Sequence, residues 1–450
     1  MANPAPGGRW SGLSRVSWFL AGLAMTSLAQ WTIVTVLARA GSPGLVGQYA
    51  LGLAVGAPVV LVCGLGLQPV LVTDVAGRFT FHEYLRLRLA GMAVALFAIG
   101  VVAYAMGSGG GPVVLLVGVA KALDAVGEIY FGILQRRRAM RTVGLSMALN
   151  AALSVVVTTV LLLATGSVAV AALGSVAGSA LGSVGYPRWV VRPDLRGAAG
   201  AGGWAALRRQ RRLVVTALPV GFAYSLTSFT GNVPMYVVQH ELGAQALGVF
   251  AALSYATMGA NLLYAAMYQV LLHRMAELAG AGRLRALRGL VVRLVLGSLL
   301  FGLVGALVAR LAGEVVLGLL YGRDYSRHWP VLVVLALGIG ASGALYFVNA
   351  ALLALHRFQH HLTATLPTLG LVAAASLLLV PRHGLIGAAS AAVLALVVEA
   401  VTKTLLLLRH ALARAVGGPA TPPPGDGEPR DRPSAGPVPP ERSTVPKVTT

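Results

Sequence analysis

The chain has 450 residues, of which 57% are hydrophobic and 11% are charged, and its mean hydropathy is +0.78. A soluble globular protein carries about twice that share of charged residues. The composition therefore excludes a soluble globular protein and indicates a membrane protein. The formal net charge of +21 would suit a nucleic-acid partner. However, the basic residues fall in the connections between apolar stretches and not on one basic face, so we expect no nucleic acid.

Apolar stretches of about 20 residues, each long enough to cross a bilayer as a helix, recur along almost the whole chain. They predict an all-α polytopic protein with about twelve transmembrane helices. The approximate ranges are 14–38, 45–73, 87–107, 112–135, 142–164, 167–190, 212–238, 245–272, 288–312, 328–354, 361–380 and 384–408. Pro58 and Gly56 are expected to kink the second span.

The arginines predict the topology of the chain. If residues 1–13 are a cytoplasmic N-terminus, the cytoplasmic connections hold the arginines within 78–88, 136–141, 188–212 and 274–288. The opposite connections hold only Arg39, Arg310, Arg323, Arg327 and Arg382. This asymmetry fits the positive-inside rule and places both termini in the cytoplasm. Residues 413–450 are rich in Pro and Gly, so we expect a disordered cytoplasmic tail there.

An internal repeat divides the predicted spans into two sets of six. The longest internal connection, about 191–211, separates residues 14–190 from residues 212–412. The segments GSPGLVGQYAL (41–51) and LGAQALGVFAA (242–252) both follow the first span of their half. Because each half has an even number of spans, the halves are predicted to be parallel repeats, two bundles around a central cavity.

Four segments resemble the Wzx-type polysaccharide exporters, which are lipid-linked oligosaccharide flippases of the multidrug/oligosaccharidyl-lipid/polysaccharide superfamily. The segments are ARAGSPGLVGQYALGLAVGAPVVLVCGLGLQPVLV, LGAQALGVFAALSYA, LYGRDYSRHWPVLVVLALG and VPRHGLIGAASAAVLALVVEA. The resemblance covers roughly 14–412. It implies two six-helix bundles around a V-shaped cavity in the cytoplasmic membrane of a bacterium. It also implies transport of lipid-linked oligosaccharide from the inner to the outer leaflet, with membrane lipids as surroundings. Coupling to H⁺ or Na⁺ is an expectation from the charged residues described next.

Lys121, Asp124 and Glu128 interrupt an otherwise apolar span. At 100° per residue they share an arc of about 60°, so they form one polar stripe. Facing lipid, each charge would cost on the order of 3 kcal/mol, so the stripe should face a cavity or another helix. Lys121 neutralises one carboxylate. The other must be protonated, paired with a cation from another helix, or bound to a transported ion. We therefore expect either ion coupling through Asp124 and Glu128 or a structural ion-pair cluster.

Further polar residues are candidates for contact with sugars in the cavity, and interhelical hydrogen bonding is the alternative for each of them. These residues are Gln30, Trp31, Gln48 and Tyr49 in the first half, and Asn232, Asn261, Tyr264, Gln269 and Asn349 in the second. Lys121 could also bind the diphosphate of a lipid carrier. Glu399 and Lys403, at i,i+4 in the last span, are expected to form a structural ion pair.

Three other functions are alternatives to a flippase. A multidrug or small-molecule cation antiporter would belong to the same superfamily, and a scaffold would have a vestigial cavity. A membrane enzyme of polysaccharide assembly would need acid-base or metal-binding residues on a large extramembrane loop, and no such loop is rich in carboxylates. We expect no catalytic residues, no metal and no cofactor. The sequence also contains no P-loop motif, which favours transport driven by a gradient.

Overall fold

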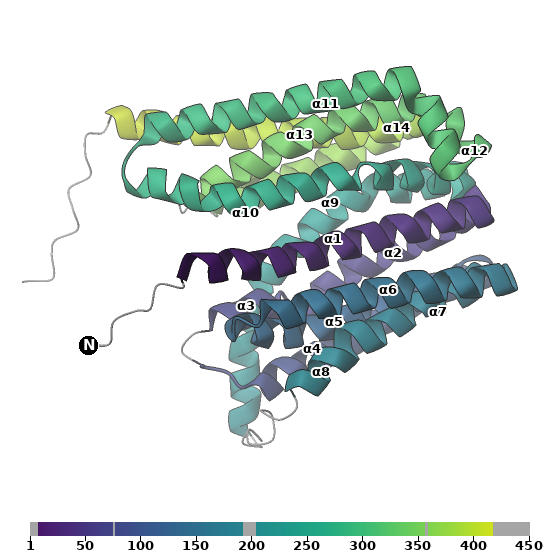
Figure 1. Cartoon of the computed structure of the whole chain (residues 1–450), viewed down its shortest axis with the longest axis horizontal. Helices are drawn as coiled ribbons and strands as arrows, with labels where there is room; N and C mark the ends of the chain where they lie inside the picture. The colour runs from purple at the N-terminus through teal and green to yellow at the C-terminus, as the bar shows by residue number, and fades with distance from the viewer. Residues whose placement is uncertain (1–7, 75–76, 192–203, 356–358, 417–450) are drawn as a thin grey trace, which may run out of the picture. The chain divides into compact units, whose positions relative to one another are not determined.

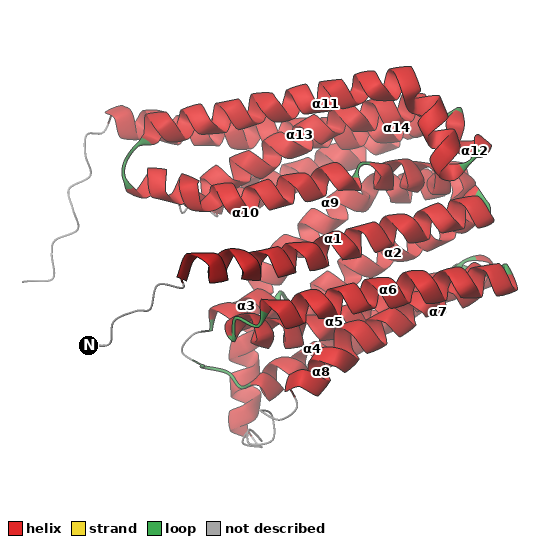
Figure 2. Ribbon diagram, in the orientation of Figure 1, coloured by secondary structure: helices red, strands yellow, loops and turns green. Residues whose placement is uncertain are grey.

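The computed structural model describes residues 8–74, 77–191, 204–355 and 359–416, and every regular element within these ranges is a helix (Figures 1 and 2). Residues Met1–Leu407 form one compact unit, and Leu408–Thr450 form a second. The predicted tail, 413–450, lies almost wholly outside the described residues, as do most of the predicted linker, 191–211, and about half of the predicted N-terminus, 1–13.

The first six predicted spans correspond to a run of helices that is broken at glycines. The helices are α1 (Gly8–Ala40), α2 (Pro43–Gly64), α3 (Leu67–Thr73), α4 (Phe81–Ala105), α5 (Gly111–Arg136), α6 (Met140–Thr165), α7 (Val168–Gly178) and α8 (Tyr186–Val191). A short 3₁₀ turn, η1 (Gly107–Gly109), precedes α5, and a π-helical stretch, η2 (Ser179–Gly185), joins α7 to α8. Gly66, with φ of 60°, separates α3 from α2 and divides the second span.

The second half is built from longer helices. They are α9 (Trp204–Ala256), α10 (Met258–Gly280), α11 (Leu284–Tyr321), the single turn α12 (Arg323–Ser326), α13 (Trp329–Ala354) and α14 (Gln359–Val416). Gly243, with φ of 82°, breaks α9, and Gly384, with φ of 57°, breaks α14. The break in α9 therefore ends one span, and the next span continues from α9 into α10, whereas α14 contains two spans. Both glycines adopt backbone conformations that other residues rarely reach without strain.

Length and composition identify nine of the described helical segments as able to cross a membrane. Two of the nine, Arg208–Gly280 and Thr365–Leu407, are the double spans broken at Gly243 and Gly384. The helix α5 is absent from this set although it has 26 residues, because its charged stripe lowers its apolar character. With α5 included and the two breaks counted, the described helices account for the twelve predicted spans.

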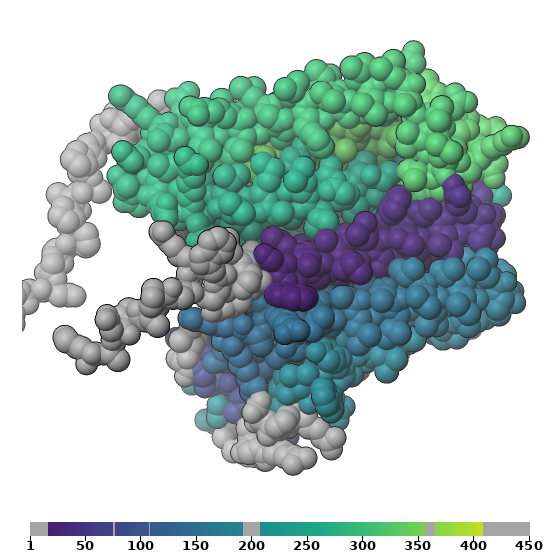
Figure 3. Space-filling view, in the orientation of Figure 1, coloured from purple at the N-terminus to yellow at the C-terminus, as the bar shows by residue number. Residues whose placement is uncertain are grey.

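The outward surfaces of the bundles are apolar, as a lipid environment requires. On α11, Leu300, Leu307 and Leu311 are 61%, 57% and 77% exposed, and this helix lies along one edge of the molecule in Figure 3. Phe97 on α4 is 74% exposed on the other half. Because so many large apolar side chains would be unstable in water, these helices are lipid-facing and the chain is a multi-pass membrane protein.

The two halves meet where the repeated segments cross. Gly47 of α2 lies against the backbone of Ala244, and Gly248 of α9 lies against the backbone of Pro43. Pro43 and Ala244 occupy the same position in their respective repeats, so the contact is reciprocal. At the other end of α2, Gly66 lies against Gly221 of α9. The helices α2 and α9 therefore pack together at several points along their length.

Candidate functional site

The polar stripe of α5 lies inside the first bundle and takes part in two ion pairs, one within the stripe and one with α4. Lys121 Nζ donates to Asp124 Oδ2 at 3.1 Å. Four residues further along, Glu128 Oε2 lies 3.4 Å from an Nη of Arg88, which α4 contributes. The stripe together with Arg88 thus contains two cations and two carboxylates, and their formal charges balance. Balanced pairs reduce the cost of placing charge at depth in a membrane.

The second oxygen of Asp124 is held by two neutral donors from other helices. Asn150 of α6 donates to Asp124 Oδ1 through Nδ2 at 2.9 Å, and the hydroxyl of Ser183 in η2 donates at 2.9 Å. The Ser154 hydroxyl in turn donates to Asn150 Oδ1 at 3.0 Å. With Lys121 included, the Asp124 carboxylate accepts three hydrogen bonds, one from a cation and two from neutral donors.

Small residues allow α5, α6 and η2 to approach closely enough for this network. Gly182 of η2 packs against Asn150, and Gly178 of α7 packs against Ser154. The Ser146 hydroxyl donates to the Gly182 carbonyl. A π-helical stretch displaces the following side chains relative to a regular helix, and such stretches are frequent at functional sites. Here the stretch contains Ser183, which reaches Asp124.

Of the three arrangements expected for the second carboxylate, the structure contains one, because Glu128 is paired with a cation from another helix. This cation, Arg88, falls in the predicted span 87–107 and is also counted above with the arginines of a cytoplasmic connection. The structure places it in α4 and not in a connection. The helix α4 begins at Phe81, two turns earlier than predicted, and the Arg88 side chain is only 3% exposed. The signal was present in the sequence. Thr80 and Glu83 form a capping box in which Thr80 N donates to Glu83 Oε2 at 2.7 Å.

A small cavity of about 50 Å³ adjoins the stripe. This volume holds on the order of one to three water molecules, and it is too small for a sugar. Its lining includes the predicted residues Gln30, Tyr49, Lys121 and Asp124 together with Thr26, Asn150, Ser154, Ser175 and Ser179. Tyr49 of α2 shares a hydrogen bond of 3.0 Å with Ser175, while Gln30 Nε2 is buried without a hydrogen-bond partner among the described residues.

The charged side chains of the stripe are partly exposed. The side chains of Lys121, Asp124 and Glu128 are 30%, 28% and 39% exposed, although Gly56 of α2 lies against Lys121. Since α2 also contacts α9 of the other half, the stripe is one helix away from the interface between the bundles.

The other predicted sugar-binding residues are not brought together in one site. Trp31 Nε1 donates to the Tyr321 hydroxyl of α11 at 2.9 Å, a bond between the halves, and Gln48 is half-buried. Asn232 donates to Ser228 of its own helix at 2.8 Å. Asn261 accepts from Ser342 at 2.6 Å. Gln269 is exposed, whereas Tyr264 is 3% exposed and packs edge-on against Phe301 and Phe347.

The second bundle has a charged cluster of its own. Lys403 is fully buried, and its Nζ lies 2.7 Å from Glu399 Oε1 and 3.0 Å from Asn349 Oδ1. Asn349, predicted as a sugar contact, is thus a neighbour of this ion pair. Among the described residues, no group of three or more His, Cys, Asp or Glu side chains is arranged to hold a metal ion.

Comparisons with known proteins identify the fold. The chain is 22% identical over 365 residues to the capsular polysaccharide biosynthesis protein CapF of Staphylococcus aureus, which covers 81% of this chain and 91% of CapF. The lipid II flippase MurJ in an inward closed conformation superposes with a TM-score of 0.68 at 12% identity, over 87% of each chain. An inward-facing MATE multidrug transporter of the MOP superfamily gives a TM-score of 0.66 at 15% identity, over 88% of this chain and 98% of that one. This chain has the MATE and MurJ fold. No family model matches the sequence.

The MATE and MurJ fold is a twelve-helix transporter fold, so the predicted fold class is confirmed. The predicted helix count agrees with the breaks at Gly243 and Gly384, which divide the segments Arg208–Gly280 and Thr365–Leu407 into two spans each.

Proposed function

We propose that this protein moves lipid-linked oligosaccharide or polysaccharide precursors across the cytoplasmic membrane of a bacterium by alternating access. The observation that carries this proposal is the agreement of two independent comparisons. A twelve-helix fold shared with a lipid II flippase coincides with sequence similarity to a capsular polysaccharide biosynthesis protein along most of both chains. In this proposal the substrate headgroup enters between the bundles from the inner leaflet, and both termini are cytoplasmic.

The proposal includes coupling to H⁺ or Na⁺ at the α5 stripe. Asp124 and Glu128 are accessible side chains in a bilayer-spanning helix, and such residues often mark ion pathways. Protonating Asp124 or binding Na⁺ there would weaken its bond with Lys121. Tyr49 and Gly56 belong to α2, contact this cluster and lie on the helix that meets the second half. A change in charge at the stripe would thus act on the interface that must rearrange during transport.

Deletion of the gene tests the proposed function. We expect lipid-linked repeat units to accumulate on the cytoplasmic face of the membrane while surface polysaccharide disappears. Reintroduction of the native chain should restore both. The MATE match favours one alternative, a multidrug or cation antiporter. If deletion leaves surface glycans unchanged and sensitises cells to cationic drugs, that alternative is correct and the flippase proposal is wrong.

A further inference from the structure

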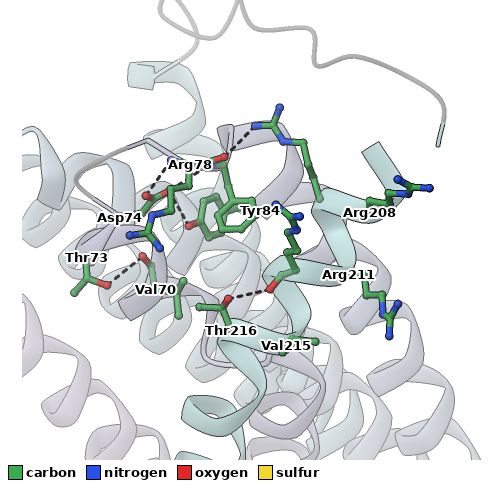
Figure 4. Close-up of a pocket in the computed structure, with 12 residues that line it drawn as sticks. Val70, Thr73, Asp74, Arg78, Tyr84, Arg208, Arg211, Val215 and Thr216 are labelled. Atoms are coloured by element: carbon green, nitrogen blue, oxygen red, sulfur yellow. Dashed lines mark hydrogen bonds between the residues drawn. The ribbon is translucent and has the colours of Figure 1, made fainter. Parts of the chain in front are cut away.

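A second, larger pocket lies apart from the α5 stripe, between the loop before α4 and the beginning of α9 (Figure 4). Its volume is about 1190 Å³, which is enough for a lipid headgroup. Five of its lining residues are arginines, and the single carboxylate among them is Asp74. The full lining is Val70, Thr73, Asp74, Arg78, Phe79, Tyr84, Arg208, Arg209, Arg211, Arg212, Val215 and Thr216.

The only acidic residue of the pocket lining, Asp74, accepts hydrogen bonds from residues close to it in the chain. The Asp74 carboxylate accepts hydrogen bonds from the backbone N–H groups of Arg78 at 3.0 Å and Phe79 at 3.1 Å, and from the Tyr84 hydroxyl at 3.3 Å. Partial burial alone would raise the pKa of Asp74, but these three donors outweigh it and hold the pKa below its ordinary value. Asp74 is therefore ionised, and its oxygens point to these three donors and not to the arginine side chains of the pocket.

One arginine of the pocket has a structural role. Arg209 Nε lies 3.1 Å from Glu83 Oε1, and the Arg209 guanidinium also donates to the Arg78 carbonyl at 2.9 Å. These contacts join the first turns of α9 to the loop before α4, across more than a hundred residues of sequence. They fix the two walls of the pocket, with Arg78 and Tyr84 on one side and Arg208 and Arg211 on the other (Figure 4).

The remaining four arginines, Arg78, Arg208, Arg211 and Arg212, have no acidic partner within salt-bridge distance in the described ranges of the chain. Three of them lie in the first turns of α9, where no acidic side chain is present. Four like charges around one pocket repel each other, and a bound polyanion would remove that repulsion. Guanidinium groups bind phosphate oxygens through paired hydrogen bonds.

We propose that this arginine pocket binds the phosphate or diphosphate headgroup of a membrane lipid. The favoured source of this headgroup is the lipid-linked substrate, whose diphosphate would bind here before it enters the space between the bundles. That choice of source rests on the proposed function. The headgroup of a bulk anionic phospholipid has the same chemistry and is the second source. The positive-inside rule accounts for arginines on one side of the membrane, but it does not require two distant segments to gather them around one pocket.

Binding to the purified full chain in nanodiscs of neutral lipid tests the proposal. The probes are a polyprenyl diphosphate, phosphatidylglycerol and inorganic pyrophosphate. The test variant is Arg208→Gln/Arg211→Gln/Arg212→Gln, which leaves the structural Arg209 in place. The matched control, Arg283→Gln/Arg285→Gln/Arg288→Gln, removes three exposed arginines at the N-cap and in the first turns of α11. A third variant replaces the same three pocket arginines with Lys, which keeps the charge but loses the paired donors.

We expect the pocket Gln variant to bind polyprenyl diphosphate about tenfold more weakly or worse, and the Lys variant to be intermediate. The control should bind as the native chain does. Undiminished binding by the pocket Gln variant, or an equal loss in the control, would overturn the proposal. Effective competition by phosphatidylglycerol would assign the pocket to bulk anionic lipid, whereas its failure to compete would assign it to the diphosphate. If the native chain binds inorganic pyrophosphate but binds neither polyprenyl diphosphate nor phosphatidylglycerol, the pocket is not a lipid headgroup site.

The same variants separate this inference from the proposed function. If the flippase proposal alone fails, the native chain will not transport lipid-linked sugar, yet the binding contrast between pocket and control variants will persist. If the pocket proposal alone fails, transport will persist in reconstituted vesicles and the binding contrast will be absent. Thermal unfolding in detergent shows whether each variant is folded, and the Lys variant remains informative if the Gln variant is not.

Discussion

Gly47 of α2 and Gly248 of α9 hold equivalent positions in the two repeats, and each packs directly against the backbone of the other repeat. The contact is reciprocal, since Gly47 meets Ala244 and Gly248 meets the corresponding Pro43. A two-fold relation between the halves, with its axis between these glycines, produces this pattern. Parallel repeats with an axis along the membrane normal have this geometry.

Gly47→Ala should therefore be destabilising, because its Cβ would overlap the Ala244 carbonyl. We expect a loss of about 2 kcal/mol or more and a fall in transport, as for overpacked interiors. Gly100→Ala in α4 is the matched control, since its Cβ would meet no atom within 4 Å. That change should stabilise by up to about 1 kcal/mol. Thermal unfolding in detergent measures both, and equal behaviour of the two variants would refute the close crossing.

Asp124→Asn should abolish transport while the protein still reaches the membrane, because an amide neither exchanges a proton nor holds a cation as a carboxylate does. Transport of labelled lipid-linked sugar into vesicles, compared at matched protein levels, measures the effect. Glu128→Gln should act in the same direction. Native rates in both variants would leave only a structural role for the stripe. The double variant Lys121→Met/Asp124→Asn should be less destabilised than Lys121→Met alone, because the single change leaves an unpaired carboxylate.

Arg88→Met should destabilise the first bundle by leaving Glu128 without its cation. Breaking a fully buried pair costs about 3–5 kcal/mol. Here we expect about 2 kcal/mol, because the Glu128 side chain is 39% exposed and solvent screens part of its charge. Adding Glu128→Gln to Arg88→Met should recover most of the loss. A double variant no more stable than Arg88→Met would show that the 3.4 Å pair is not the source of the effect.

Lys403→Met should be the more destabilising of the two Lys-to-Met changes, since Lys403 is fully buried and Glu399 is only 10% exposed. We expect a loss of about 3–5 kcal/mol. The paired change Glu399→Leu/Lys403→Met should restore stability and retain transport, unlike changes at Asp124. If the paired variant is stable but does not transport, the second-half cluster has a functional role that our interpretation omits.

Single cysteines test the topology in a chain from which Cys63 has been removed. Gly109→Cys and Gly166→Cys should react with an impermeant reagent added to intact cells, whereas Ala139→Cys and Ala281→Cys should not. Gly109 and Gly166 lie at exposed turns that flank α5 and α6, so a lack of reaction there would reflect sidedness and not burial. The opposite labelling pattern would invert the proposed orientation.

The sequence alone determined the class of protein and the approximate spans, because a bilayer requires about 20 apolar residues for each crossing helix. It also revealed the repeat containing Gly47 and Gly248 and the polar stripe of α5. These features are local in the chain, since one segment and its periodicity are enough to recognise each of them.

Only the tertiary structure decided which groups meet. Arg88 lies in another helix from Glu128, and Asn150 and Ser183 reach Asp124 from α6 and η2. The sequence contains many other arginines and serines, and nothing in their spacing shows which of them pairs with Asp124 or Glu128. The choice among them depends on where α4 begins, on the extra residue in the turn of η2, and on glycines that let helices approach within contact. Pairing between helices follows from rotation and depth in the packed bundle, and neither is encoded in the spacing along a single segment.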